Sequence, residues 1–567
     1  MKKFFHILRR AWQMGLATAI VLLYYRCKKR LFIRYWRGRK HVFAPLQAPS
    51  TSSPITVSIL GFGTHTFPSS SAITWHQDLF VATSPAAWRT AFFADITIPV
   101  NYALNLTTTR QADIKVPWEL SRLHLLHDVD AATLLAILDA WMQHNPFPYG
   151  VNWYNPMEVA IRAINIILAV NKHRTALTAQ QEKSIRQLLA LHAQFIEHCW
   201  EVSDRPNNHY LADLVGYLYL CCYLDIKKYY RSRYRAWRWL QHAFKHQILA
   251  DGTSYEGSTA YHRLDAQLLY LALICAQKHG LRIDSWWYDL QARMHQFIAD
   301  CSDAPGTLVT IGDDDGGSIV PEPLSPAPAP SLQSTATYRD FGLSIVRHAG
   351  AHFTFRHPAY RGHQPSGHFH HDWLAITYSV DGIPVFIDPG SYLYTAHPLW
   401  RNQQRSAAAH CTFLPSTAIA IPAQLDLFQL NMPPKESTGR VETTAERVVV
   451  RDAYQHGSAT LSRTCTITRK GLVVQDYAVS AEQQAISWFL HLGPSITAQR
   501  IEKRTWLLLH KQQPLVRLDS IVFLHEQPGI ASATYGAAQP TTRLVGSAQT
   551  EQGNKVMQQI TATLVRH

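Results

Sequence analysis

The chain lacks several patterns that would place it in a common class. Its eight cysteines form no CxxC pair and no dense cluster, so neither a cysteine zinc ribbon nor a disulfide framework is expected, and buried free thiols are predicted. Gly61-Phe62-Gly63 is followed by neither a third glycine nor a helical pattern, which argues against a dinucleotide site. Asp313-Asp314-Asp315-Gly316-Gly317 lacks the alternating ligands and the later glutamate of an EF-hand, so a turn is predicted there.

Acidic side chains are absent from residues 2–40, which contain 12 lysines and arginines. The net charge of +14 is therefore concentrated in this segment, and about +2 remains for the rest of the chain. Met14 to Tyr25 form an apolar run that is shorter than the ~20 residues a membrane-spanning helix needs. A charged start and a short run are typical of a signal peptide, but basic residues follow the run and a small-x-small cleavage site is lacking. Residues 1–45 are interpreted either as a signal-like segment or as an uncleaved or interfacial membrane anchor.

The length of the chain predicts at least two domains, and the apolar pattern predicts that the first of them is helical. At 567 residues the chain exceeds what one hydrophobic core usually organises, so at least two domains are expected. Apolar residues recur at helical spacing from about 130 to 303, with runs at 182–201, 209–225, 232–248, 258–280 and 284–301. Successive helices with short polar joints indicate a bundle, a solenoid or an α/α toroid, and this helical domain is predicted over residues 46–320.

Proline marks a change of architecture in the middle of the chain. Residues 321–334 contain five prolines and predict a linker, which we place at 321–337. Beyond it, short β-branched or aromatic runs such as His352 to Arg356 and Arg447 to Arg451 are bounded by Gly, Pro and Asp. These runs predict an antiparallel β-sandwich over residues 338–567, which lines one side of a cleft formed with the helical domain.

Three metal-competent side chains follow one another in the second half of the chain. They are His370 in a Gly-His-Phe-His motif, Asp388 in Val-Phe-Ile-Asp-Pro-Gly, and His410 in Ala-Ala-Ala-His. Two imidazoles and a carboxylate suit zinc. Each sits beside an apolar run that predicts a strand, so the three are expected to converge from neighbouring strands of one sheet. His371 stays an alternative ligand, because the first motif reads His-Phe-His-His.

These motifs carry a family resemblance. Gly-His-X-His, Val/Ile-Asp-Pro-Gly and Ala-Ala-His resemble the heparinase II/III-like polysaccharide lyases, and so, in the helical half, do Asn207 to Leu211 and Glu256 to Arg263. The resemblance covers roughly residues 75 to 560 and implies an incomplete (α/α) toroid followed by an antiparallel β-sandwich. It also implies that His370, Asp388 and His410 hold a structural zinc ion, which leaves His368 free for the substrate.

A lyase of this kind removes the C5 proton of a 4-linked uronic acid and expels the glycosidic oxygen from C4. The carboxylate of the sugar must be neutralised by hydrogen bonds, because negative charge accumulates there. Asn208 and His209 are the candidates for this role, since an amide donates without adding a competing base and an imidazole supplies a second donor. The alternative for Asn208 is a cap of the helix that begins near His209.

Tyr261 and His368 are the candidates for proton transfer. A tyrosine can serve as base and as acid, but its reference pKa is near ~10, so a base role needs nearby positive charge. His262 and Arg263 are candidates for supplying that charge. The resemblance implies that tyrosine and histidine share the two roles according to the stereochemistry of the substrate. The alternative for Tyr261 is an ordinary aromatic on a helix face.

Three arginines are candidates for binding the substrate. Arg263 follows the Tyr261 motif, and Arg401 and Arg405 precede the Ala-Ala-Ala-His segment. A guanidinium group can bind a carboxylate through two parallel hydrogen bonds. The alternatives are a solvated charge at Arg263 and a carboxylate partner within the sandwich for Arg405.

The predicted function is a polysaccharide lyase that cleaves a uronic-acid glycan, a bacterial capsular polysaccharide or exopolysaccharide, by β-elimination with structural Zn²⁺. The predicted partner is this acidic polysaccharide; nucleic acid and a redox cofactor are not expected. One alternative is a non-catalytic polysaccharide-binding component of capsule export, and another is a zinc-dependent hydrolase that activates water. The predicted location is the periplasm, with an anchor in the inner membrane. The cytoplasmic face is the alternative, because the larger basic cluster follows the apolar run.

Overall fold

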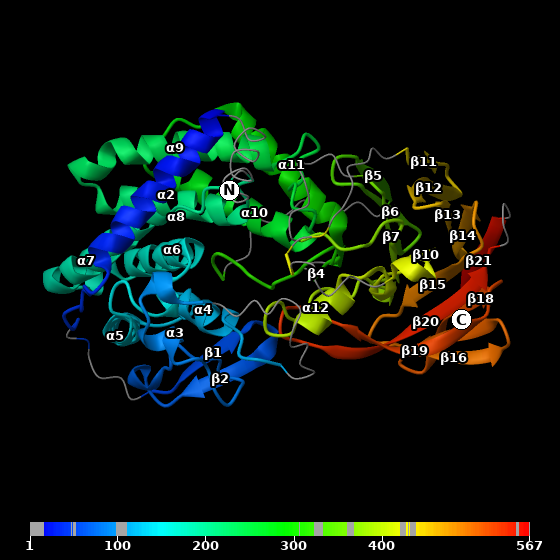
Figure 1. The fold of residues 1–567 in the computed structure, drawn as a ribbon, viewed down its shortest axis with the longest axis horizontal. Coiled ribbons are helices and arrows are strands. Elements are labelled where there is room, and N and C mark those ends of the chain that lie inside the picture. Colours follow the sequence, from blue (N-terminus) through cyan, green and yellow to red (C-terminus); the bar gives the residue numbers. More distant parts are fainter. Residues whose placement is uncertain are drawn as a thin grey trace, which may run out of the picture.

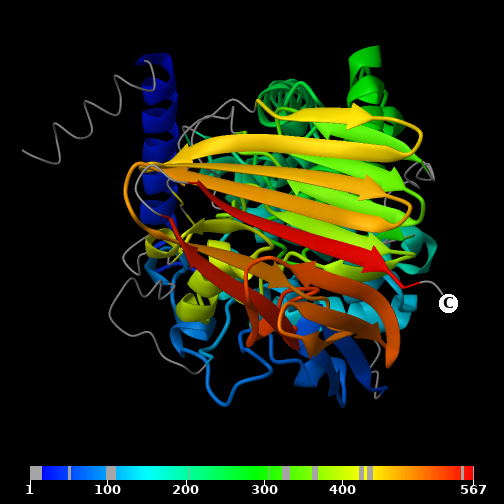
Figure 2. The same ribbon diagram turned by 90° about the vertical axis from the view of Figure 1, so that its right-hand side faces the viewer.

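A helical part is followed by a strand-rich part in the computed structural model (Figures 1 and 2). The structure describes residues 16–46, 48, 53–97, 110–203, 205–304, 307–321, 333–359, 368–419, 427–428, 430, 438–550 and 555–565. The predicted fold class, a helical toroid followed by an antiparallel β-sandwich, is confirmed.

The helices lie where the apolar periodicity predicts them, with ends shifted by a few residues. Those that build the toroid are α4 (Lys115–Ser121), α5 (Ala131–His144), α6 (Pro156–Lys172), α7 (Ala179–Cys199), α8 (Asn208–Leu224), α9 (Lys227–Gln247), α10 (Thr259–Lys278) and α11 (Ser285–Cys301). Their starts follow local chemistry: Thr178 and Gln181 form a capping box at α7, and Pro156 opens α6 after the Asn155 cap. Their apolar faces share one core.

The predicted N-terminal apolar run is the beginning of a longer helix. Helix α2 (Leu16–Trp36) starts inside the run and continues through the basic residues; Met14 and Gly15 lie outside the described residues. Its Phe32 is buried and packs against Phe195 and His198 of α7. Among the described helices, none has the length and apolarity to cross a membrane. The hairpin β1 (Ile55–Ile59) and β2 (Gly63–Phe67) follows.

The proline-rich linker lies almost wholly outside the described residues, which resume at Gln333. The first strand after it, β5 (Ser334–Tyr338), begins within the predicted linker range of 321–337. A short pair of strands, β3 (Ser302–Ala304) and β4 (Thr307–Leu308), already follows α11.

The sandwich contains three antiparallel sheets. Five strands pair in the order β5, β6 (Leu343–His348), β7 (Ala351–Arg356), β8 (Ile376–Val380) and β9 (Ile383–Phe386). Eight strands, seen face-on in Figure 2, pair in the order β11 (Arg440–Thr443), β12 (Arg447–His456), β13 (Ala459–Thr468), β14 (Gly471–Ser480), β21 (Lys555–Leu564), β18 (Gln513–Ser520), β17 (Thr505–His510) and β16 (Ile496–Glu502). Four strands pair in the order β10 (Phe413–Pro415), β15 (Ala485–His491), β20 (Gln539–Gln549) and β19 (Leu524–Ala531). Inward residues alternate with outward ones along β12 and β13, which buries the apolar half of each strand in a shared core.

Direct polar contacts join the two parts of the chain. The Tyr535 hydroxyl, just after β19, donates to the Asp113 carboxylate before α4 at 2.7 Å. The backbone N–H groups of Asp340 and Phe341 donate to the Asp251 carboxylate, which follows α9. These contacts fix the sandwich against the end of the toroid where the candidate site lies.

Candidate active site

A cavity of about 400 Å³ lies between the toroid and the sandwich. The four predicted catalytic residues, Asn208, His209, Tyr261 and His368, all line it. Three of them come from α8 and α10, and the fourth comes from the loop before β8. The structure therefore brings together residues that are up to 160 positions apart in the sequence.

Asn208 is the first residue of α8, and a buried glutamate, Glu256, binds its side chain. Its amide nitrogen donates to both oxygens of Glu256, at 3.1 and 2.8 Å, and its backbone N–H donates to the same carboxylate at 2.8 Å. The interpretation of Asn208 as the helix cap is wrong: Asn207 is the cap, because its side chain accepts from the N–H of His209. Asn208 is thus held at the cavity wall with its carbonyl oxygen unbonded among the described residues.

His209 carries a positive charge at neutral pH. Burial opposes protonation of the ring, but the Glu201 carboxylate, 3.1 Å from Nδ1, raises the pKa of His209 to about 9. The imidazolium is therefore a charged donor in the cavity wall.

Tyr261 stacks on His368, with ring centroids 3.5 Å apart and planes 19° from parallel. The Tyr261 hydroxyl also lies 3.3 Å from that of Tyr394. Burial, together with the nearby Asp315 and Asp313 carboxylates, raises the pKa of Tyr261 well above its ordinary value. The phenol therefore holds its proton at neutral pH and is a proton donor.

The expected cationic neighbours of Tyr261 are directed elsewhere. His262 is hydrogen-bonded to the backbone of Ser254 and Met294, and burial lowers its pKa to about 4. Arg263 extends toward Asp314 at 4.0 Å and does not line the cavity. The prediction that one of them activates Tyr261 is wrong, because successive residues of a helix point in different directions.

His368 is held between two buried carboxylates. Its Nδ1 lies 3.0 Å from Asp313, and its Nε2 lies 3.4 Å from Glu256. Because an ionised carboxylate only accepts hydrogen bonds, Nδ1–H of His368 donates to Asp313, which leaves Nε2 as the ring nitrogen on the other side. Asp313 itself stays ionised: burial opposes this, but Arg401 holds the pKa of Asp313 well below its ordinary value.

The structure places Arg401 and Arg405 away from the cavity lining. Both are buried: Arg401 binds both oxygens of Asp313 and the Leu427 carbonyl, and Arg405 binds Asn402 and the Leu427 carbonyl. A guanidinium group so engaged has few donors left for a substrate. The cations that line the cavity are instead Lys115, which is paired with Asp315, and Arg122, which binds Glu158 through two hydrogen bonds.

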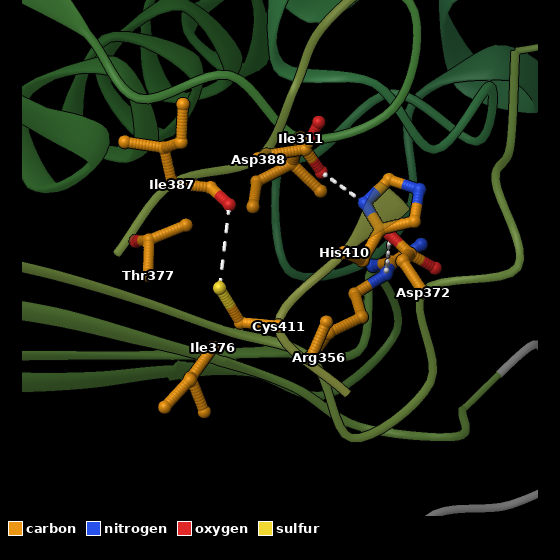
Figure 3. A pocket seen from close by; sticks show the side chains of 10 residues that line it. Ile311, Arg356, Asp372, Ile376, Thr377, Ile387, Asp388, His410 and Cys411 are labelled. Atoms are coloured by element: carbon orange, nitrogen blue, oxygen red, sulfur yellow. Dashed lines mark hydrogen bonds and ion pairs between the residues drawn. The ribbon is translucent and has the colours of Figure 1, made fainter. Parts of the chain in front are cut away.

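The three predicted metal ligands meet at one point. Nitrogen or oxygen atoms of His370, Asp388 and His410 all lie within 4.8 Å of one another (Figure 3 shows Asp388 and His410). Nδ1 of His370 is buried without a hydrogen-bond partner among the described residues, and Nδ1 of His410 lies 3.1 Å from the Asp388 carboxylate. Unpartnered buried nitrogens are costly unless a ligand such as a metal ion binds them, so this donor set fits the predicted ion.

The surroundings of this cluster agree with a closed metal site. Asp313 binds the second ring nitrogen of His370 at 2.8 Å, as outer-shell carboxylates do for metal-bound histidines. The adjoining cavity, seen in Figure 3, has a volume of about 10 Å³, enough for one water-sized occupant. The ligands do not come from one sheet as expected: His370 and Asp388 flank β8 and β9, whereas His410 precedes β10 of the four-stranded sheet.

Phe369 lies between His368, which lines the cavity, and His370, which belongs to the candidate metal cluster. Its ring lies against Gly257, where an added Cβ would meet the ring at 2.2 Å. The alternative ligand His371 is outside the cluster; it lines a separate cavity, and burial lowers its pKa to about 4.

Sequence reasoning missed Glu256, Asp313, Tyr394 and the cavity cations Lys115 and Arg122. Glu256 is the first residue of the Glu256 to Arg263 motif, and that position is the sequence signal that could have identified it. Asp313 was interpreted as part of a turn, and only its contacts show that it joins His368 to the metal cluster.

Comparison with known proteins identifies the family of the C-terminal part of the chain. Residues 331–559 match the family model described as heparinase II/III-like, C-terminal. The C-terminal part of this chain is a heparinase II/III-like domain. The resemblance deduced from the motifs is thereby confirmed, and the family is one of polysaccharide lyases. A comparison with curated protein sequences gives no match.

Solved structures extend the likeness to the helical part. A heparinase III structure superposes with a TM-score of 0.64 at 12% identity, covering 95% of this chain and 89% of that one. The heparan sulfate lyase HepC from Pedobacter heparinus superposes with a TM-score of 0.55 at 14% identity, covering 82% and 79%. At such identities the likeness establishes a shared fold, which includes the helical part of the chain.

Proposed function

We propose that this heparinase-like protein is a lyase that cleaves a uronic-acid polysaccharide by β-elimination. The observation that carries the proposal is the stacked pair Tyr261 and His368 in a cavity whose wall also holds the charged His209. Proton donor, proton acceptor and carboxylate-binding cation are the three functions the reaction needs, and they lie within one cavity.

Neutralisation of the sugar carboxylate falls to His209, with Asn208 beside it. The imidazolium places a full positive charge where negative charge accumulates as the C5 proton leaves. Lys115 and Arg122 add positive charge to the wall, although each is already paired with carboxylates. The cavity is therefore suited to an acidic sugar.

Proton transfer divides between the stacked rings. His368 accepts the C5 proton on Nε2, while Asp313 stabilises the resulting imidazolium through Nδ1–H. Tyr261, which its raised pKa keeps protonated at neutral pH, donates its phenolic proton to the departing O4. Electrons from the broken C5–H bond form the C4=C5 double bond, and the C4–O bond breaks.

A zinc ion bound by His370, Asp388 and His410 would tie the loops before β8, after β9 and before β10 together. The small cavity there has no room for a sugar, which favours a structural ion over the hydrolase alternative. His370 then contacts Asp313, which also orients His368, so the ion supports the proton acceptor indirectly.

The proposed substrate is a bacterial capsular polysaccharide or exopolysaccharide, and the proposed place of action is the periplasmic surface of the inner membrane. Support for the membrane comes from α2, which exposes Ile20, Leu23 and Tyr24 beside arginines and lysines and contains no acidic residue. Helix α9 contributes seven more lysines and arginines and likewise no acidic residue. Two such helices suit peripheral binding to anionic lipid.

The test is ultraviolet absorbance of the unsaturated uronate during incubation with a panel of uronic-acid polysaccharides. One polymer is expected to give a rise, and Tyr261→Phe is expected to reduce the rate by about 10²- to 10⁴-fold, since it removes only the phenolic proton. Tyr154→Phe, at the same cavity but outside the stacked pair, is the matched control and should retain activity. Binding of a polymer without any absorbance change would instead favour the non-catalytic export component.

A further inference from the structure

A second cluster of metal-competent side chains lies in the helical part, away from the sandwich. Cys222 on α8, Cys275 on α10 and His279 at the end of α10 place two sulfur atoms and one ring nitrogen within 4.8 Å of one another. Both cysteines are buried and free, and His279 is partly exposed. The proposed lyase reaction uses none of the three.

The local helix geometry explains why these side chains meet. Cys275 and His279 are four residues apart, so they lie on the same face of α10. Cys222 lies in the last turn of α8, which packs against α10. The cluster is therefore built on two helices rather than on loops, and such sites hold their geometry well.

The backbone at this place also favours a cation. Helix α8 ends at Leu224 and α10 ends at Lys278, so both helices present their C-terminal ends near the cluster. The C-terminus of a helix carries partial negative charge from its unpaired carbonyl groups. Asp225, the exposed cap residue after α8, lies three residues beyond Cys222, and its carboxylate is paired with Arg233 at 3.4 Å.

We propose that Cys222, Cys275 and His279 bind a zinc-class divalent cation, with water at the fourth position. Two thiolates and one imidazole are a borderline-soft donor set that prefers zinc to magnesium or calcium. The ion fastens the C-terminal ends of α8 and α10 to each other. Binding releases the two thiol protons to solvent and involves no change of oxidation state.

Cobalt(II) distinguishes this site from the one in the sandwich, because the sandwich cluster contains no sulfur. The full-length protein is reduced, stripped with a chelator and titrated with Co²⁺ while near-ultraviolet absorbance is recorded. A thiolate-to-cobalt charge-transfer band is expected, and Zn²⁺ should displace it. Cys222→Ser and Cys275→Ser are each expected to abolish the band, and His410→Ala is expected to leave it unchanged.

Cys221→Ser is the matched control, since Cys221 is buried next to Cys222 but lies outside the cluster. The two cysteine variants could fail to fold, so His279→Ala is tested as well, because this side chain is partly exposed. It should weaken Co²⁺ affinity by more than the ~10- to 100-fold that loss of an outer-shell partner costs. Absence of the band in the reduced wild-type protein, or an unchanged band in Cys222→Ser, would overturn the proposal. So would a Cys222–Cys275 disulfide that persists under reducing conditions.

Discussion

Carboxylates near the cavity determine the charge or the orientation of the side chains that line it. His209 is protonated because Glu201 lies beside it, and Asn208 is oriented because Glu256 binds its amide. His368 is flanked by Asp313 and Glu256. Three residues that the motifs alone would leave undistinguished thus receive different roles from their immediate partners.

Glu201→Gln is expected to move the alkaline limit of activity to lower pH. In the wild-type protein the pKa of about 9 keeps His209 charged through neutral pH, and loss of the carboxylate leaves burial to lower that pKa. The measurement is kcat/KM against pH, which reports ionisations of the free enzyme. Glu197→Gln, in the last turn of α7 and facing Lys228, should leave the profile in place. An alkaline limit that stays unchanged in Glu201→Gln would contradict the role given to His209.

Gly257→Ala is expected to destabilise the protein and to reduce activity. The residue has φ +74°, which costs a residue with Cβ about 1–2 kcal/mol, and the new methyl group would also push on the Phe369 ring next to His368. Gly280→Ala is the matched control, because Gly280 has φ +64° with nothing within 4 Å of an added Cβ. Urea unfolding measures the loss of stability in both variants, and the difference between them is the cost of the contact with Phe369. Equal losses would show that the Phe369 ring moves aside freely and would contradict this prediction.

At the scale of single elements, α2 and α9 have surfaces unlike those of the other helices. Each of these helices exposes apolar or aromatic side chains among its basic residues. They are Leu31 and Tyr35 on α2, and Tyr230 and Tyr234 on α9. The other face of α2 is anchored by Phe32 in the toroid core. The helix is therefore part of the folded body while its outer face stays free for a partner.

Arg30→Glu combined with Arg34→Glu is expected to weaken binding to anionic lipid vesicles. Each basic residue near such a surface contributes about 1 kcal/mol, so the double reversal should cost at least ~2 kcal/mol, or roughly 30-fold in affinity. The measurement is co-sedimentation with vesicles containing phosphatidylserine or phosphatidylglycerol at low and high salt. Arg440→Glu combined with Arg447→Glu, on exposed positions of the sandwich, is the control. Equal binding by both double variants would refute the surface assigned here.

At the scale of the whole molecule, one buried network joins the toroid to the sandwich. Asp313, after β4, binds His368, His370, Ser391 and Arg401 of the sandwich. The metal cluster adds a link between the five-stranded and four-stranded sheets. The proton acceptor therefore sits where three substructures meet, and its position depends on all of them.

Removal of metal is expected to lower the melting temperature by several degrees. An ion that binds only the folded state stabilises it by about 2.7 kcal/mol when its free concentration is a hundredfold above Kd. Thermal unfolding with and without chelator, together with elemental analysis, measures both effect and stoichiometry. His410→Ala should lose one equivalent of metal. His371→Ala should lose none, because His371 lies outside the cluster; the reverse pattern would reassign the ligand.

Local patterns were enough for much of this molecule. The helices from α7 to α11 follow from apolar periodicity, and the candidate ligands His370, Asp388 and His410, which lie together in the structure, follow from short motifs next to strands. The roles of Arg401 and Arg405 did not follow, because a buried arginine next to a motif looks the same in sequence as an exposed one. The Asn207 cap was missed for a related reason: two adjacent asparagines compete for one position, and backbone geometry decides between them.

By itself the sequence determined the order of the helical and strand-rich parts, the family of the C-terminal part and the residues proposed to carry the chemistry, because each depends on periodicity or on motifs of a few residues. Only the tertiary structure decided which charges those residues hold. Glu201, Glu256, Asp313 and Arg401 act on the site through contacts that chain folding brings about. Pairing energies inside a protein depend on distance and burial, and neither can be read from positions along the chain.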